Sequence, residues 1–145
     1  MENVEHIAKE ISDLVPVMIR HMYPFVFQPI ELPPSQILTI STLFEKGTCR
    51  LNELSREMHN TAPTTSGIID RLVSAGYVTR VPDPQDRRAV QITLTKKGVK
   101  IARQFHFNIM RRWEFILSKL PQGEGEEILK VLRRITRGFT DGTIS

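Results

Sequence analysis

Apolar residues recur every three or four positions along most of the chain, which is the spacing of amphipathic helices. Caps, prolines and glycines set the ends of these segments. We expect the first helix to end before Pro24 and residues 25–32 to form an apolar linker, because proline lacks a backbone N–H and clashes with the preceding turn. The pattern predicts helices over 4–23, 34–46, 51–58, 62–75, 96–120 and 124–139.

The apolar spacing changes to alternation between residues 77 and 94. Val90, Ile92 and Leu94 fall on one side of a predicted strand over 89–94, and 77–81 is rich in β-prone residues. The intervening segment, 82–88, holds two prolines and two aspartates and favours a turn. Two short helices followed by a hairpin predict a winged helix-turn-helix, so the fold class is mainly α with a small β-hairpin wing.

The terminal helices carry long apolar stripes but lie outside the predicted winged helix. Each stripe must be buried, either against the chain's own winged helix or against a second copy in a two-fold dimer. We favour the homodimer. The sequence thus predicts one continuous domain, in which residues 1–32 and 96–145 form a helical dimerisation region and 33–95 form the winged helix-turn-helix DNA-binding region.

The excess positive charge lies in the middle of the chain. The net charge is +4, and residues 47–100 contain nine Lys and Arg against five acids, whereas the other segments balance. Such a segment suits a nucleic-acid-binding face, although a solvated basic surface has the same composition. The sequence has no apolar run long enough to predict a membrane span, and its start lacks a secretory signal. The single cysteine fits a reducing compartment. We therefore expect a cytoplasmic protein without membrane contact.

Four short motifs resemble those of one protein family. They are Thr-Thr-Ser-Gly-Ile-Ile-Asp-Arg-Leu at 64–72, Gly-Tyr-Val-Thr-Arg at 76–80, Asp-Pro-Gln-Asp-Arg-Arg at 83–88 and Leu-Thr-Lys-Lys-Gly at 94–98. In sequence, spacing and flanking helices the chain resembles the MarR family of bacterial and archaeal transcriptional regulators. The resemblance implies a homodimer that binds a pseudo-palindromic operator in double-stranded DNA, more often as a repressor than as an activator.

The predicted recognition helix turns Thr65, Ile69 and Leu72 to the core, which leaves a polar side for the major groove. Thr64 and Ser66 have the alternative role of capping the helix, and Arg71 that of pairing with a nearby acid. Gly67 departs from the family, which often has a longer polar residue there. The candidate DNA-binding residues of this helix are Pro63, Thr64, Ser66, Gly67 and Arg71.

The predicted wing carries Arg87 and Arg88 at its tip, where a long cation can enter the minor groove. The resemblance places the inserted arginine at Arg88 and implies that Asp86 braces it; the alternative is an exposed ion pair that stiffens the turn. Further basic residues are candidates for phosphate contacts, or else plain surface charges. These are Arg50, Arg56, Lys96 and Lys97.

Relatives in this family bind small aromatic or phenolic acids, so the resemblance also implies an effector. Its candidate pocket residues, which have a core role as their alternative, are Met18, His21, Met22, Tyr23, Phe25, Ile40, Phe44 and His106. We expect Cys49 to be a small buried residue, and the dispersed histidines predict no metal site. No catalytic motif or cofactor site is predicted, so the alternative to a DNA-binding regulator is a winged-helix protein-interaction module.

Overall fold

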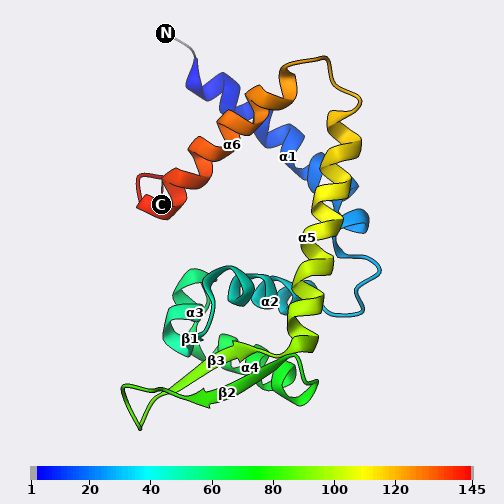
Figure 1. Ribbon diagram of the computed structural model, residues 1–145. Coiled ribbons are helices and arrows are strands. Elements are labelled where there is room, and N and C mark those ends of the chain that lie inside the picture. Colours follow the sequence, from blue (N-terminus) through cyan, green and yellow to red (C-terminus); the bar gives the residue numbers. More distant parts are fainter. Residues whose placement is uncertain (1–2, 145) are drawn as a thin grey trace. The chain divides into compact units, whose positions relative to one another are not determined.

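The computed structural model describes residues 3–144, which form six helices and a small sheet (Figure 1). The chain divides between Ile109 and Met110 into two compact units. No helix among the described residues is long and apolar enough to cross a membrane. The elements are α1 (Val4–Phe27), α2 (Pro34–Lys46), β1 (Cys49–Arg50), α3 (Leu51–Glu57), α4 (Ala62–Ser74), β2 (Val78–Pro82), β3 (Val90–Leu94), α5 (Lys96–Leu117) and α6 (Glu124–Asp141).

The predicted winged helix is confirmed in the first unit. Short helices α3 and α4 are followed by the β2–β3 hairpin, whose loop projects away from the helices (Figure 1). Thr61 caps α4 by accepting a hydrogen bond from the N–H of Thr64, and Gly76, with φ +82°, ends the turn after α4. These local signals explain why the boundaries of α4 were predictable.

The sheet has a third strand that the sequence pattern did not predict. Its order is β1–β3–β2, and both pairings are antiparallel. Strand β1 consists of two residues, Cys49 opposite Ile92 and Arg50 opposite Gln91. Two residues are too few to show alternation, so this strand is defined by its partner and not by its own pattern.

The core of the winged helix forms where α2, α3, α4 and the sheet meet. Ile40, Leu54, Ile69 and Leu72 are fully buried there, and Ala102 joins them from α5. A second, smaller cluster joins α1, α2 and α5 around further buried residues. Its members are Val26, Ile37 and Phe105.

Helix α1 was predicted to end before Pro24, but in the structure it continues to Phe27. The prediction of a linker over 25–32 is therefore wrong for its first three residues. Pro24 removes one hydrogen bond, while Val26 is buried and the Phe27 ring lies 5.4 Å from that of Phe105. Asn108 also donates to the carbonyl oxygens of Val26 and Gln28, at 3.1 and 3.2 Å, and so stabilises the end of α1.

The second unit holds the end of α5 and the whole of α6. Helix α6 begins with acidic residues in its first turn, as the helix dipole favours. Near its end, Gly138 lies against Ile144, whose side chain would clash with any Cβ at residue 138. Most of the apolar side chains of α6 are nevertheless exposed.

Candidate nucleic-acid interface

Helix α4 has one buried and one polar side, as predicted. Thr65, Ile69 and Leu72 are completely buried, and Ile68 is nearly so. The candidate residues lie on the other side, where Ser66 and Gly67 are half-buried at its edge. The structure therefore gathers on one surface Pro63, Thr64, Ser66, Gly67 and Arg71.

The hydroxyl of Thr64 takes part in the cap of α4 as an acceptor only. The Thr61 hydroxyl donates to Thr64 Oγ1 at 2.9 Å and accepts from the Thr64 N–H at 3.3 Å. Thr64 keeps its own hydroxyl proton for another acceptor. Ser66 forms no side-chain hydrogen bond within the described part of the chain, so its hydroxyl is also available.

Arg71 does not form an ion pair with Asp70, its neighbour in the sequence. Asp70 instead forms an ion pair with Arg80 on β2. Arg71 is exposed and forms no ion pair within residues 3–144. Its guanidinium group is therefore available to a phosphate or a base edge.

Gly67, in the middle of α4, has free space where a side chain would lie. A Cβ at this position would meet no atom within 4 Å. The fold itself therefore does not require glycine here, and the missing side chain leaves space for another molecule to approach the backbone.

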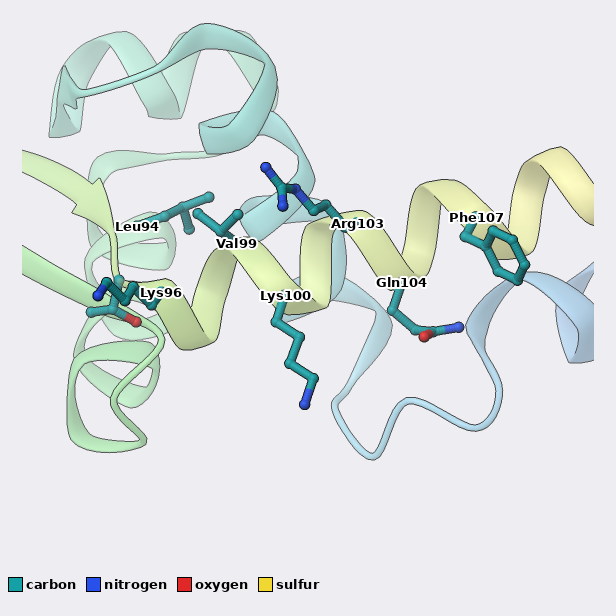
Figure 2. A pocket seen from close by; sticks show the side chains of 8 residues that line it. Leu94, Lys96, Val99, Lys100, Arg103, Gln104 and Phe107 are labelled. Atoms are coloured by element: carbon teal, nitrogen blue, oxygen red, sulfur yellow. The ribbon is translucent and has the colours of Figure 1, made fainter.

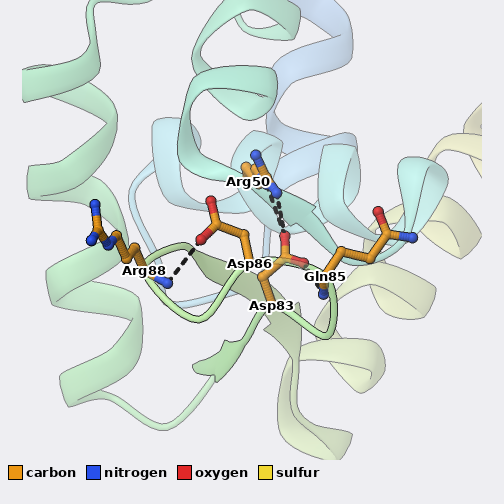
Figure 3. Close-up of polar contacts among 5 residues, drawn as sticks. All are labelled: Arg50, Asp83, Gln85, Asp86 and Arg88. Atoms are coloured by element: carbon orange, nitrogen blue, oxygen red, sulfur yellow. Dashed lines mark hydrogen bonds and ion pairs between the residues drawn. The ribbon is translucent and has the colours of Figure 1, made fainter.

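The wing tip exposes Arg87 and Arg88, neither of which forms an ion pair in the described structure. Asp86 Oδ1 accepts a hydrogen bond from the backbone N–H of Arg88 at 3.0 Å (Figure 3). Asp86 thus holds the backbone of the tip and leaves the guanidinium group of Arg88 unpaired. The alternative of a stiffening Asp–Arg ion pair at the tip is not what the structure shows.

Arg50 and Asp83 form an ion pair at the base of the wing (Figure 3). Arg50 Nε and Nη2 lie 2.8 and 2.7 Å from Asp83 Oδ2, and the Gln85 N–H donates to Asp83 Oδ1 at 2.8 Å. The Gln85 N–H and the Arg50 guanidinium hold the pKa of Asp83 below its usual value, because both stabilise the ionised carboxylate. The same pair raises the pKa of Arg50.

The four predicted phosphate contacts divide into two kinds. Arg50 is held by Asp83, and Lys97 Nζ donates to the carbonyl oxygen of Ala75 at 2.7 Å. Arg56 and Lys96 are exposed and have no ion pair in the described residues. Sequence reasoning missed the partners of Arg50 and Lys97 because these partners lie 33 and 22 positions away along the chain.

Three of the predicted effector residues line one hollow. Met18, Met22 and Tyr23 line an apolar hollow of about 270 Å³ on α1, whereas the other candidates are absent from its lining. Ile40 was wrongly placed in a cleft, since it is fully buried in the core of the winged helix. The residues that lie elsewhere are His21, Phe25, Ile40, Phe44 and His106.

A larger hollow of about 650 Å³ lies along the first half of α5 (Figure 2). Lys96, Lys100 and Arg103 bring positive charge to it, and the ends of Lys100 and Arg103 diverge in Figure 2. The sequence carried a signal for this surface, because these three cations are four and three positions apart on a predicted helix. The hollow is lined by Leu94, Thr95, Lys96, Val99, Lys100, Arg103, Gln104 and Phe107.

Helices α3 and α4 together with the β2–β3 hairpin define a winged helix-turn-helix protein. The model of the family described as MarR matches residues 32–90. The HTH-type transcriptional regulator YsmB of Bacillus subtilis (strain 168) is 30% identical over 128 residues, which cover 88% of this chain and 85% of that protein. The chain belongs to the MarR family, whose members are non-enzymatic DNA-binding transcription regulators.

Two solved structures show the same fold. A MarR family protein from Bacillus stearothermophilus has a TM-score of 0.81 and 24% identity, and the match covers 94% of this chain and 97% of that one. Streptococcus pneumoniae FabT, solved in complex with DNA, has a TM-score of 0.76 and 21% identity, with 96% and 99% of the two chains covered.

Proposed function

We propose that this protein binds a pseudo-palindromic operator in double-stranded DNA as a homodimer and represses transcription. The observation that carries the proposal is the wing tip, where Arg87 and Arg88 are exposed and unpaired while Asp86 holds the backbone beneath them. A buried or paired arginine would stabilise the fold. An unpaired arginine on a loop whose backbone is held in place is instead suited to bind a polyanionic partner.

The recognition helix and the wing have complementary roles in this proposal. The polar side of α4 enters the major groove, where Thr64 and Ser66 offer hydroxyl groups and Arg71 offers a guanidinium group. Arg88 enters the adjacent minor groove, whose negative potential attracts cations. FabT, which has the same fold, was solved in complex with DNA, and this supports DNA as the partner.

The homodimer is supported by apolar side chains that the single chain leaves exposed. On α1, Ile11 and Leu14 are 52% and 60% exposed, and on α6 Val131 and Phe139 are 53% and 60% exposed. A second copy would remove these surfaces from water. Two-fold symmetry would then present two recognition helices to half-sites about 34 Å apart on one side of the DNA.

Repression follows if the operator overlaps a promoter, because the bound dimer would then exclude RNA polymerase. Such a regulator acts where the chromosome lies, so we infer a cytoplasmic location. Effector binding would act by changing the spacing of the two recognition helices.

We infer that the effector is a small aromatic or phenolic acid that binds in the hollow along α5. Each of Lys96, Lys100 and Arg103 offers a cation with which a carboxylate can pair singly, while Val99 and Phe107 offer apolar surface for a ring. The smaller hollow on α1 is lined by apolar side chains and Tyr23, and provides no cation.

The test begins with selection of bound duplexes from a random DNA pool. The binding of the wild type, Arg88→Ala and the control Lys130→Ala to a selected duplex is then compared by fluorescence anisotropy over a salt series. Arg88→Ala should weaken binding about tenfold or more and reduce the slope of log affinity against log salt, whereas Lys130→Ala should not.

Recovery of a two-fold-symmetric site would support the homodimer and its operator. If refolded, ligand-free protein enriches no duplex and Arg88→Ala changes nothing at low salt, the DNA-binding proposal fails and the protein-interaction module takes its place.

A further inference from the structure

Three successive carbonyl groups after the recognition helix are bound by residues at the start of α5. Lys97 Nζ donates to the Ala75 oxygen at 2.7 Å, and Thr95 Oγ1 donates to the Gly76 oxygen at 2.6 Å. The Thr95 N–H donates to the Tyr77 oxygen at 3.1 Å. Carbonyl groups at a helix end lack partners within the helix, so these donors satisfy groups that water would otherwise bind.

Thr95 and Lys97 each make a second contact that fixes them in this arrangement. Thr95 Oγ1 accepts a hydrogen bond from the Gly98 N–H at 3.2 Å and so caps α5 while it binds the turn after α4. Lys97 Nζ lies 4.3 Å from the centroid of the Tyr77 ring, within the range of a cation–π interaction. A positive charge at the end of α4 is also favoured by the helix dipole.

Gly98 brings the backbones of the two segments into close contact. A Cβ at this position would lie 2.1 Å from the Tyr77 carbonyl oxygen, a distance that real Cβ atoms essentially never show. The first turn of α5 therefore approaches the turn after α4 more closely than any other residue type would allow at position 98.

We propose that Thr95, Lys97 and Gly98 form a latch that fixes the end of the recognition helix to the start of α5. Lys97 is then a positioning residue for DNA binding and does not contact a phosphate. The inference rests on the proposed function for its effect on DNA, but the latch itself is a property of the free protein. Through it, any movement of the start of α5 moves the recognition helix as well.

The first test measures the latch without DNA. Amide hydrogen exchange is followed in the wild type, in Lys97→Met, which keeps the length of the side chain, and in the matched control Lys96→Met. The N–H groups of Ala75, Gly76 and Tyr77 donate to carbonyl groups of α4 and report whether its end opens. Lys97→Met should speed their exchange about tenfold, and Lys96→Met should not. Equal exchange in all three proteins would overturn the latch.

The second test compares DNA binding by the wild type, Lys97→Met and the control Lys130→Ala, because Lys96 is itself a candidate phosphate contact. If the latch positions α4, Lys97→Met should weaken binding to the selected operator about tenfold, leave binding to an unrelated duplex unchanged and leave the salt slope unchanged. Lys97→Arg, which keeps the cation, should restore much of the affinity.

A phosphate contact at Lys97 would give a different result and would refute the positioning role. Lys97→Met would then weaken both duplexes alike and reduce the salt slope by about one. Unchanged operator affinity in Lys97→Met would equally overturn that role. A wild-type protein that selects no duplex would refute the proposed function, while the exchange result would still decide whether the latch exists.

Discussion

Arg50 and Asp83 show how a single long-range contact changes the role of a basic residue. By its charge and place in the sequence, Arg50 is a candidate for a phosphate contact. In the structure its guanidinium group binds Asp83, whose side chain is only 4% exposed. Arg50 therefore attaches the wing to β1, and the cations at the wing tip, Arg87 and Arg88, stay unpaired in the described residues.

Asp83→Asn should destabilise the protein near neutral pH and lose this effect in acid. The pKa of Asp83 is lowered in the folded protein from its ordinary value of 3.8, so its ionised form favours folding. This contribution is complete above that ordinary value and disappears as pH falls through the lower folded value. Urea unfolding of both proteins, followed by circular dichroism from about pH 7 to about pH 3, measures the difference.

The double variant Arg50→Met/Asp83→Asn provides the control for this pair. It should be less destabilised than the sum of the two single variants, because each single change leaves one charge without its partner. A difference between wild type and Asp83→Asn that stays constant over the whole pH range would contradict the role given to the carboxylate.

At the scale of elements, the sequence predicted those segments whose signals are local. Thr61 and Gly76 mark the ends of α4 and its turn, and the alternation around Ile92 marks β3. The end of α1 and the strand β1 were missed because they depend on partners elsewhere in the chain. Asn108 binds the last carbonyl groups of α1, and β3 defines β1.

The candidate site was predictable to the same extent. The side of α4 that faces away from the core follows from helical spacing, and the structure keeps the predicted residues together there. The partners of Arg50 and Lys97 were not predictable, because no periodic pattern indicates a contact between distant segments. The split of the effector residues has the same cause.

Two glycine-to-alanine substitutions within helices should have opposite effects on stability. Gly67→Ala should raise the free energy of unfolding by about 0.5–1 kcal/mol, because alanine favours the helix and the site has open space. Gly98→Ala should lower it by about 1–3 kcal/mol, since its methyl group meets the Tyr77 carbonyl oxygen. Thermal and urea unfolding measure both changes.

The same Gly67→Ala protein separates stability from recognition. If DNA approaches the backbone of α4 at this point, the more stable variant should bind the selected operator more weakly than the wild type does. Tighter or equal binding would show that the missing side chain has no part in DNA approach.

At the scale of the whole molecule, the exposed apolar side chains of α6 predict a dimer that one charge can disrupt. Leu132 is 43% exposed in the single chain, where lysine would be tolerated. In a two-fold interface Leu132→Lys would bury two like charges, one from each copy. Size-exclusion chromatography with light scattering should show twice the chain mass of 16.7 kDa for the wild type and a shift toward one chain for the variant.

Lys130→Ala, on the same helix, serves as the control and should stay dimeric. A wild-type protein that is monomeric at every concentration would contradict the dimer. Its exposed stripes would then need another partner.

Because β3 is the central strand, the base of the wing is fixed independently of the length of its loop. Strand β3 is paired on both sides, and Asp83 is tied to Arg50, so the base of the hairpin is fixed at three places. Within the described residues, the loop from Pro84 to Arg88 makes hydrogen bonds only within itself and to its flanking residues Asp83 and Ala89. Insertions or deletions within this loop would therefore change how far Arg88 extends without shifting the register of either strand. The length of the wing can therefore change while the scaffold beneath it stays the same.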